Sequence, residues 1–291
     1  MAMAYKVILV PVDSNAGRRA LRAALAILGG SGGHIEAFHV RADSKEAVPL
    51  LGEGMSGSMI EEMIDLADKD GDERSRAARA IFDTFVAETK VAVTEGIAIG
   101  GATPTASWHE EVGREDEKVA NHGRVSDLIV MAQPAGEVGR PSMMALHAAI
   151  FETARPVLML PDQVPAKIGS TVVVAWNGTS EAARAVAGAM PFLKSANRVI
   201  ALTVETEKSV NRIGGDELAH YLGAHNIKVE RASVKRTEKP VGETILDYCK
   251  SVDADLLVTG AFTHSRLIQI ILGGVTRHLI ASAHLPVLMD H

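Results

Sequence analysis

The sequence repeats one pattern at about half its length, and this repeat limits the folds that the chain can adopt. Residues 7–13 (VILVPVD) return as residues 172–177 (VVVAWN), so that Asp13 aligns with Asn177 at an offset of 164. Val40 and Val204 share that offset. Two later segments return at offsets of 128 and 130: DLIV at 127–130 as DLLV at 255–258, and PVLM at 156–159 as PVLM at 286–289. We therefore expect two similar domains in tandem.

The sequence of each copy predicts alternating strands and helices. The runs at 7–13 and 35–40 are short, apolar and rich in β-branched residues, which is typical of strands buried on both faces of a parallel sheet. Between them, Ser14 or Asn15 can cap a helix whose apolar residues recur at helical spacing: Ala20, Leu21, Ala24, Leu25 and Leu28. Strand, helix and strand in this order give a right-handed crossover. The prediction is an α/β chain of two doubly wound domains, each with a mainly parallel sheet.

A linker divides the two copies. Residues 161–170 hold two prolines and a glycine without an apolar period, which favours an exposed connection. We predict domains at 1–161 and 170–291, which suits a length of 291 residues. Two similar halves in one chain are expected to pair about a pseudo-two-fold axis.

The first copy carries an extra segment at about 41–75. The offsets differ by 36 residues (164 − 128), so the first half is longer between its second and fourth strands. A glycine-rich loop leads there into an acidic helix with one apolar face (Met59, Ile60, Met63, Ile64 and Ala67), and a second helix is predicted at 74–88. We expect an ordinary surface helix that packs on its own domain; the alternative is a lid or a dimer contact.

One stretch of the second copy has the pattern of an anion site. A buried strand ends at Gly260, a loop follows, and Gly273 and Gly274 open the last helix. A helix start carries unpaired N–H groups and partial positive charge, and glycine allows a phosphate to approach the backbone. The alternative is a turn that binds nothing, since glycine often only marks a turn.

Together these features resemble the universal stress protein family. They are a strand that ends in Asp or Asn, a glycine after the fourth strand, a glycine pair at the last helix and a closing PVLM strand. The resemblance covers essentially the whole chain and is best in the second half. It implies a five-stranded parallel sheet of the adenine nucleotide alpha hydrolase-like type in each domain. ATP-binding members carry glycine, two residues, glycine, nine residues, then glycine followed by Ser or Thr; here Thr263 replaces the second glycine and Gly274 replaces the Ser or Thr.

The resemblance also implies the residues of a nucleotide site. Asn177 would hold the adenine–ribose end, beside Ala175, Trp176 and Val204. The phosphate end would use the loop and the helix start: Gly260, Thr263, His264, Ser265, Arg266, Gly273, Gly274, Val275 and Thr276. The implied ligand is ATP or AMP, with Mg²⁺ accompanying ATP. A Gly273→Val variant is expected to lose binding.

The first half keeps only part of this pattern. Pro11, Val12, Asp13 and Val40 fit the family at the adenine end. Its phosphate loop does not, because Ala132 and Ala135 take the two early glycine positions and Met143 and Met144 take the glycine pair. Side chains there would occupy the phosphate space, so we predict that this half binds no nucleoside triphosphate.

Charge and motifs exclude several other functions. A net charge of −6 argues against binding nucleic acid through a basic face, and the single cysteine, Cys249, is read as a packed thiol. No metal site is predicted: His220 and His225 lie five apart, which does not suit one helix face. No stretch of 18 apolar residues and no leader is present, so we expect a cytoplasmic protein without a membrane span.

Three functions remain, in order of preference. The first is a stress-response regulator or protective protein that binds an adenine nucleotide in its C-terminal half with little or no catalysis, and that can form a homodimer. The second is a protein-interaction module of the same fold that does not use nucleotide. The third is a slow ATPase, which is disfavoured because the loop lacks the carboxylate base, the lysine and the acidic Mg²⁺ site that phosphoryl transfer needs.

Overall fold

A computed structural model describes residues 4–13, 15–30, 32–44, 56–97, 101–134, 142–205, 213–261 and 274–291. The first half runs β1 (Val7–Pro11), α1 (Asn15–Leu28), β2 (Gly33–Arg41), α3 (Gly57–Thr89), β3 (Ala92–Val93), β4 (Pro104–Val112), α4 (Glu115–Gly123), β5 (Leu128–Ala132), α5 (Met143–Glu152) and β6 (Val157–Leu160). The second half runs β7 (Thr171–Ala175), α6 (Ser180–Gly188), α7 (Met190–Ser195), β8 (Arg198–Glu205), α8 (Gly215–Ala224), β9 (Val229–Lys235), α9 (Val241–Ser251), β10 (Leu256–Gly260), α10 (Gly274–Ser282) and β11 (Val287–Asp290).

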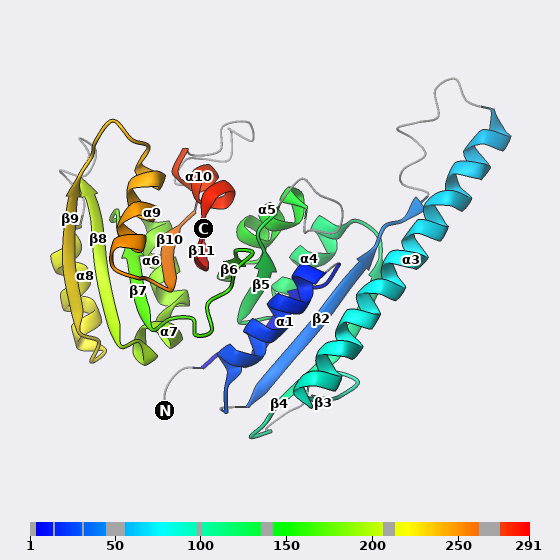
Figure 1. Ribbon diagram of the computed structural model, residues 1–291, viewed down its shortest axis with the longest axis horizontal. Coiled ribbons are helices and arrows are strands. Elements are labelled where there is room, and N and C mark those ends of the chain that lie inside the picture. Colours follow the sequence, from blue (N-terminus) through cyan, green and yellow to red (C-terminus); the bar gives the residue numbers. More distant parts are fainter. Residues whose placement is uncertain are drawn as a thin grey trace.

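The described strands form one twisted sheet of 11 strands in the order β3-β4-β2-β1-β5-β6-β11-β10-β7-β8-β9 (Figure 1). The order in one half mirrors the order in the other, and every pairing is parallel except β6 with β11. At that junction Leu158 lies opposite Leu288, its own counterpart in the repeat. Two copies of one strand facing each other antiparallel place a pseudo-two-fold axis through this pair. The predicted fold class is confirmed; the edge strand β3 is an addition in the first half.

Helices cover both faces of the sheet, and each face buries one apolar cluster. The first cluster lies under α1, α3, α6, α7 and α8, and it joins residues of both halves. The second lies under α4, α5, α9 and α10. Cys249 of α9 is fully buried in this second cluster, and burial raises the pKa of its thiol to about 12. The predicted packed thiol is confirmed.

An aspartate at the amino edge of the sheet explains one repeated motif. The Asp255 carboxylate accepts the backbone N–H groups of Gly169, Ser170 and Thr171, which lead into β7. Asp127 accepts the N–H groups of Lys6 and Val7 at the start of β1. The aspartate at the start of DLIV and DLLV therefore fixes the entrance of the neighbouring first strand in each half, because it satisfies amides that no strand partner reaches.

The extra segment differs from the prediction in one respect: α3 is a single helix of 33 residues, where the pattern predicted two. The helix continues through Gly71 because Arg41 of β2 forms ion pairs with Asp68 (3.3 Å) and Asp72 (2.8 Å) on either side of that glycine. Its first turns extend beyond the end of β2 (Figure 1). Met59, Met63 and Leu66 are 50%, 38% and 68% exposed there, so this part of α3 does not pack on its own domain as expected.

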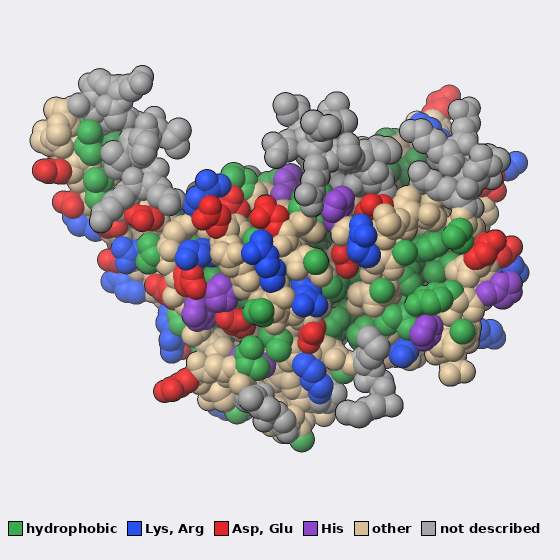
Figure 2. Space-filling model, turned by 180° about the vertical axis from the view of Figure 1, so that it is seen from behind, with side chains coloured by type: hydrophobic (Ala, Val, Ile, Leu, Met, Phe, Trp, Pro, Cys, Tyr) green, Lys and Arg blue, Asp and Glu red, His purple; other side chains and the backbone are tan. Residues whose placement is uncertain are grey.

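Residues 106–108 lie within β4, which spans nine residues. On the side of the molecule seen in Figure 2, acidic and basic side chains are interspersed, and no single basic face stands out. None of the helices within the described ranges is both long enough and apolar enough to cross a membrane.

Candidate functional site

The carboxyl ends of β7, β8 and β10 form the edge at which the sequence places its nucleotide site. Ala175, the last residue of β7, lies between Leu202 of β8 and Thr259 of β10. Ligands in doubly wound folds bind outside such carboxyl ends. Three of the predicted residues, Ala175, Val204 and Val275, are partly buried against one apolar cluster, so this part of the predicted set does come together.

Trp176 lies at this edge but directs its side chain elsewhere. It belongs to the cluster on the opposite face of the sheet, and only 8% of its surface is exposed. Its indole Nε1–H donates to the carbonyl of Ile213 (2.9 Å), just ahead of α8, and its backbone N–H donates to the carbonyl of Leu202 (2.8 Å). The ring therefore anchors α8, and only the backbone carbonyl of Trp176 remains at the edge.

Asn177 shapes the turn that opens α6. Its side-chain oxygen accepts the backbone N–H of Thr179 (3.2 Å) and the Thr179 hydroxyl (2.9 Å). Thr179 in turn caps α6 by accepting the N–H of Ala182 (3.3 Å). The residue is exposed at the mouth of the edge, where its amide can face a ligand while its oxygen holds the turn.

The two described glycines of the set have different surroundings. A Cβ at Gly260 would lie 2.5 Å from the backbone nitrogen of Ala182 and 2.7 Å from the carbonyl carbon of Glu181. The first turn of α6 thus packs directly on Gly260, and this contact requires glycine without any ligand. A Cβ at Gly274 would meet no atom of the described residues within 4 Å. Within the described structure, Gly274 thus begins α10 with space beside it, and an approaching anion needs such space.

Thr276, in the first turn of α10, is 5% exposed. The remaining predicted residues, Thr263, His264, Ser265, Arg266 and Gly273, lie outside the described ranges, as does Ala135 of the first half. The described part of this edge offers backbone groups, an amide and an apolar wall. At the adjacent end of β11, Asp290 pairs with Gly260, and the His291 ring lies 3.0 Å from the carbonyl of Ala261.

At the matching edge of the first half, side chains of the protein itself take up the polar contacts. His39 of β2 is 3% exposed, and its Nδ1 lies 2.8 Å from the carbonyl of Val12 and 3.0 Å from the carboxylate of Asp13. Burial alone would lower the pKa of His39, but the hydrogen bonds to Asp13 and Val12 outweigh it and raise the pKa. The side chain of Asp13, the residue that fits the family pattern, is thus already engaged by His39.

A second acid lies beside this pair. Burial and the Asp13 charge raise the pKa of Glu115 to about 7, and its Oε1 has no hydrogen-bond partner in the described structure. Ser142 caps α5 by accepting the N–H of Ala145 (2.9 Å), and it also hydrogen-bonds Glu115. The Glu115 carboxyl group and the Ser142 cap thus lie at the start of α5, the position that corresponds to Gly274 at the start of α10.

The methionines of this half lie at the start of the equivalent helix. Met143 and Met144 are 42% and 59% exposed at the start of α5. The acidic pair and the serine cap also disfavour a phosphate at this helix start.

Glu115→Gln should stabilise the protein at high pH and have little effect at low pH. The folded state binds this proton more tightly than the unfolded chain, so the wild type loses stability as pH rises from its usual pKa of 4.5 through about 7, whereas glutamine mimics the protonated acid. Urea unfolding across this range measures the difference. Glu117→Gln, an exposed acid of the same helix, serves as the control and should show no such pH dependence.

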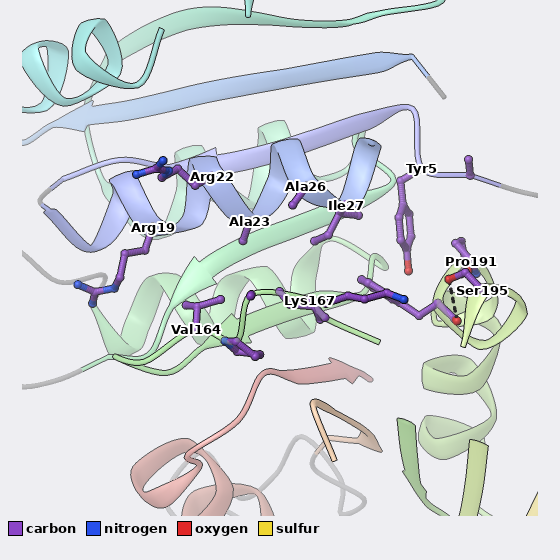
Figure 3. Close-up of a pocket in the computed structure, with 15 residues that line it drawn as sticks. Tyr5, Arg19, Arg22, Ala23, Ala26, Ile27, Val164, Lys167, Pro191 and Ser195 are labelled. Atoms are coloured by element: carbon purple, nitrogen blue, oxygen red, sulfur yellow. Dashed lines mark hydrogen bonds between the residues drawn. The ribbon is translucent and has the colours of Figure 1, made fainter. Parts of the chain in front are cut away.

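One described cavity, of about 840 Å³, lies away from both edges. It is bounded by α1, the linker and α7, and is lined by Tyr5, Arg19, Arg22, Val164, Lys167 and Phe192 among others (Figure 3). Tyr5 precedes β1 and Lys167 precedes β7, so the cavity adjoins the amino ends of the first strands, opposite to the edge where such folds bind nucleotides.

Comparison with known proteins agrees with this architecture. Residues 170–291 match the model of the Universal stress protein family. A universal stress protein from Archaeoglobus fulgidus shares the fold with a TM-score of 0.63 at 16% identity, covering 98% of this chain and 97% of its own. A Pseudomonas aeruginosa protein assigned to the universal stress proteins gives 0.55 at 14%, covering 99% and 93%. A further structure from that organism, of unknown function, gives 0.52 at 14%, covering 99% and 92%. No curated protein matches the chain.

The C-terminal half is therefore a universal stress protein domain, and the resemblance seen in the sequence is confirmed there. For the whole chain, the solved structures show the same fold at identities too low to carry function.

Proposed function

We propose that the C-terminal universal stress protein domain binds an adenine nucleotide, ATP or AMP, and that the chain acts as a ligand-responsive regulator or protective protein with little or no catalysis. The observation that carries the proposal is the start of α10 at the carboxyl edge of a parallel sheet, where Gly274 leaves space beside helix N–H groups. The phosphates would lie there, and the base would lie toward Ala175 and Val204.

The difference between the halves supports one site per chain. At the second edge the described start of α10 has space for polar groups of a ligand, whereas at the first edge His39 and Glu115 already contact Asp13. An acid next to a capped helix start repels phosphate. One nucleotide per chain is the expected stoichiometry, with Mg²⁺ accompanying ATP.

Mass spectrometry of the purified full chain under native conditions tests the proposal. We expect a complex heavier than the chain by one adenine nucleotide, or formation of that complex when ATP is added. Phosphate release should not exceed that of a variant with impaired binding, because the proposed site binds the nucleotide without hydrolysing it. Sustained turnover of ATP would favour the slow ATPase instead.

A nucleotide-independent interaction module is the second candidate, and one observation favours it. The first turns of α3 carry the exposed Met59, Met63 and Leu66 on a helix that extends beyond the sheet. Exposed methionines suit an adaptable protein contact, including one between two copies of the chain. A protein that never binds nucleotide but forms a dimer that Met59→Lys disrupts would support this candidate over the first.

A further inference from the structure

A second group of titratable side chains lies between β4 and α4 in the first half. His109 and Glu111 alternate on β4 and therefore share one face of that strand. His122, in the last turn of α4, reaches the same place. Glu111 Oε1 lies 2.8 Å from His122 Nε2 and 3.2 Å from His109 Nε2, so one carboxylate oxygen faces two imidazole nitrogens.

Glu36 of β2 fixes the orientation of His122. Its carboxylate lies 3.2 Å from His122 Nδ1, on the far side of the ring from Glu111. A neutral imidazole has one N–H, so His122 can donate to only one of Glu36 and Glu111, and its other ring nitrogen directs a lone pair at a carboxylate. A lone pair facing a carboxylate oxygen is repulsive unless a cation, either a second proton or a metal ion, lies between them. Histidines that bind a metal through one ring nitrogen commonly hydrogen-bond a carboxylate through the other.

Two further residues hold the group in place. The buried ring of Phe38 stacks on His122 (centroids 4.3 Å apart) and on His109 (5.6 Å). The Lys118 ammonium lies 2.6 Å from the other oxygen of Glu111. This contact occupies one carboxylate oxygen, and Oε1 remains directed at the two imidazoles.

We propose that His109 Nε2, Glu111 Oε1 and His122 Nε2 bind a divalent transition-metal ion of the zinc class. The three ligand atoms all lie within 4.8 Å of one another. Around a tetrahedral ion with bonds of about 2.0–2.1 Å, ligand atoms are about 3.3 Å apart, so small shifts of partly exposed side chains suffice. His109 is 43% exposed, which leaves a fourth position open to water.

The donor set selects the class of metal. Two imidazoles and one carboxylate suit zinc and its neighbours in the first transition row, whereas magnesium and calcium prefer oxygen ligands alone. The charges also favour a cation, since Glu36 and Glu111 carry two negative charges and Lys118 offsets one.

The sequence did not suggest this site, because its ligands come from separate elements. Neither the spacing of His109 and Glu111 nor the distance to His122 matches a helix or loop motif. The one available signal is the alternation of His109 and Glu111, which becomes meaningful only when β4 is known to be a strand.

Zinc titration by calorimetry, on full-length protein first stripped with a chelator, tests the proposal. We expect one zinc ion per chain and a higher melting temperature with zinc. His122→Ala and His109→Ala should abolish the tight heat signal, and Glu36→Gln should weaken affinity by about 10–100-fold through loss of its orienting role. His225→Ala, an exposed histidine of the second half, is the matched control and should bind like the wild type.

Circular dichroism of each variant shows whether it still folds, and cobalt substitution gives an absorption spectrum that reports the ligand geometry. Two results would overturn the site. The first is no binding of zinc, cobalt or nickel by folded wild type, which would identify His122 as an imidazolium paired with Glu36 and Glu111. The second is zinc binding that persists in His109→Ala and His122→Ala, which would locate the ion elsewhere.

Discussion

Gly260→Val is expected to destabilise the second half severely, with a loss of about 3 kcal/mol or more in the free energy of unfolding. The added side chain would start 2.5 Å from the backbone nitrogen of Ala182, and backbone cannot rotate aside as a side chain can. Either β10 or the first turn of α6 must move, although both pack on buried apolar residues. Chemical denaturation followed by circular dichroism measures the loss.

Gly274→Ala provides the matched control. Its Cβ would meet no atom of the described residues within 4 Å, and alanine favours helix formation, so the free energy of unfolding should stay within about 1 kcal/mol of the wild type or rise slightly. If Gly260→Val folds with wild-type stability, α6 does not pack on this glycine and the account of it is wrong.

Gly274→Asp is expected to weaken nucleotide binding by more than 10-fold, roughly the effect of 1.4 kcal/mol, while leaving the protein folded. The carboxylate would sit at the start of α10, where it repels a phosphate and at the same time favours the helix dipole. A loss of affinity without a loss of stability separates a binding role from a structural one. Affinity is measured by titration with ATP and stability by thermal unfolding of the same sample.

Gly215→Asp is the comparison variant, because Gly215 is the first residue of α8 and its Cβ would make only an ordinary 3.5 Å contact with Thr203. It adds the same charge to another helix start of the same half. If Gly274→Asp and the wild type bind ATP with equal affinity, the start of α10 is not part of the nucleotide site.

The repeat in the sequence predicted most of the fold. Segments such as 7–13 and 172–177 are read as buried strands because strands covered on both faces are continuously apolar, and β1 and β7 lie there. The order of the strands within each half follows from the crossover rule. The sequence of either strand alone could not predict that β6 and β11 pair and join the halves into one sheet. Both strands are equally apolar, and their pairing depends on how the two halves assemble.

The sequence does not reveal contacts that come from a distant element. At Gly260 the packing of α6 requires glycine whether or not a phosphate also lies there. Trp176 looked like part of the ligand edge, but its indole packs on the other face and holds the segment before α8. In α3 the ion pairs of Arg41 with Asp68 and Asp72 stabilise the helix on both sides of Gly71. The local sequence of α3 could not predict them, because Arg41 belongs to β2.

The two halves show how one architecture can be used differently. In the second half a helix start remains open beside an apolar wall; in the first half His39, Asp13 and Glu115 form a buried network at the equivalent place. The first half instead presents a histidine–carboxylate group on its outer face. We infer that the halves have diverged in ligand chemistry while the sheet that joins them stayed symmetric.

The central claim is a single adenine-nucleotide site in the second half, and calorimetric titration of nucleotide-free full-length protein with ATP and with AMP tests it most directly. We predict saturable binding of one equivalent per chain, weakened by Gly274→Asp and unaffected by Glu115→Gln. No heat at millimolar nucleotide, or binding of two equivalents per chain, would contradict it.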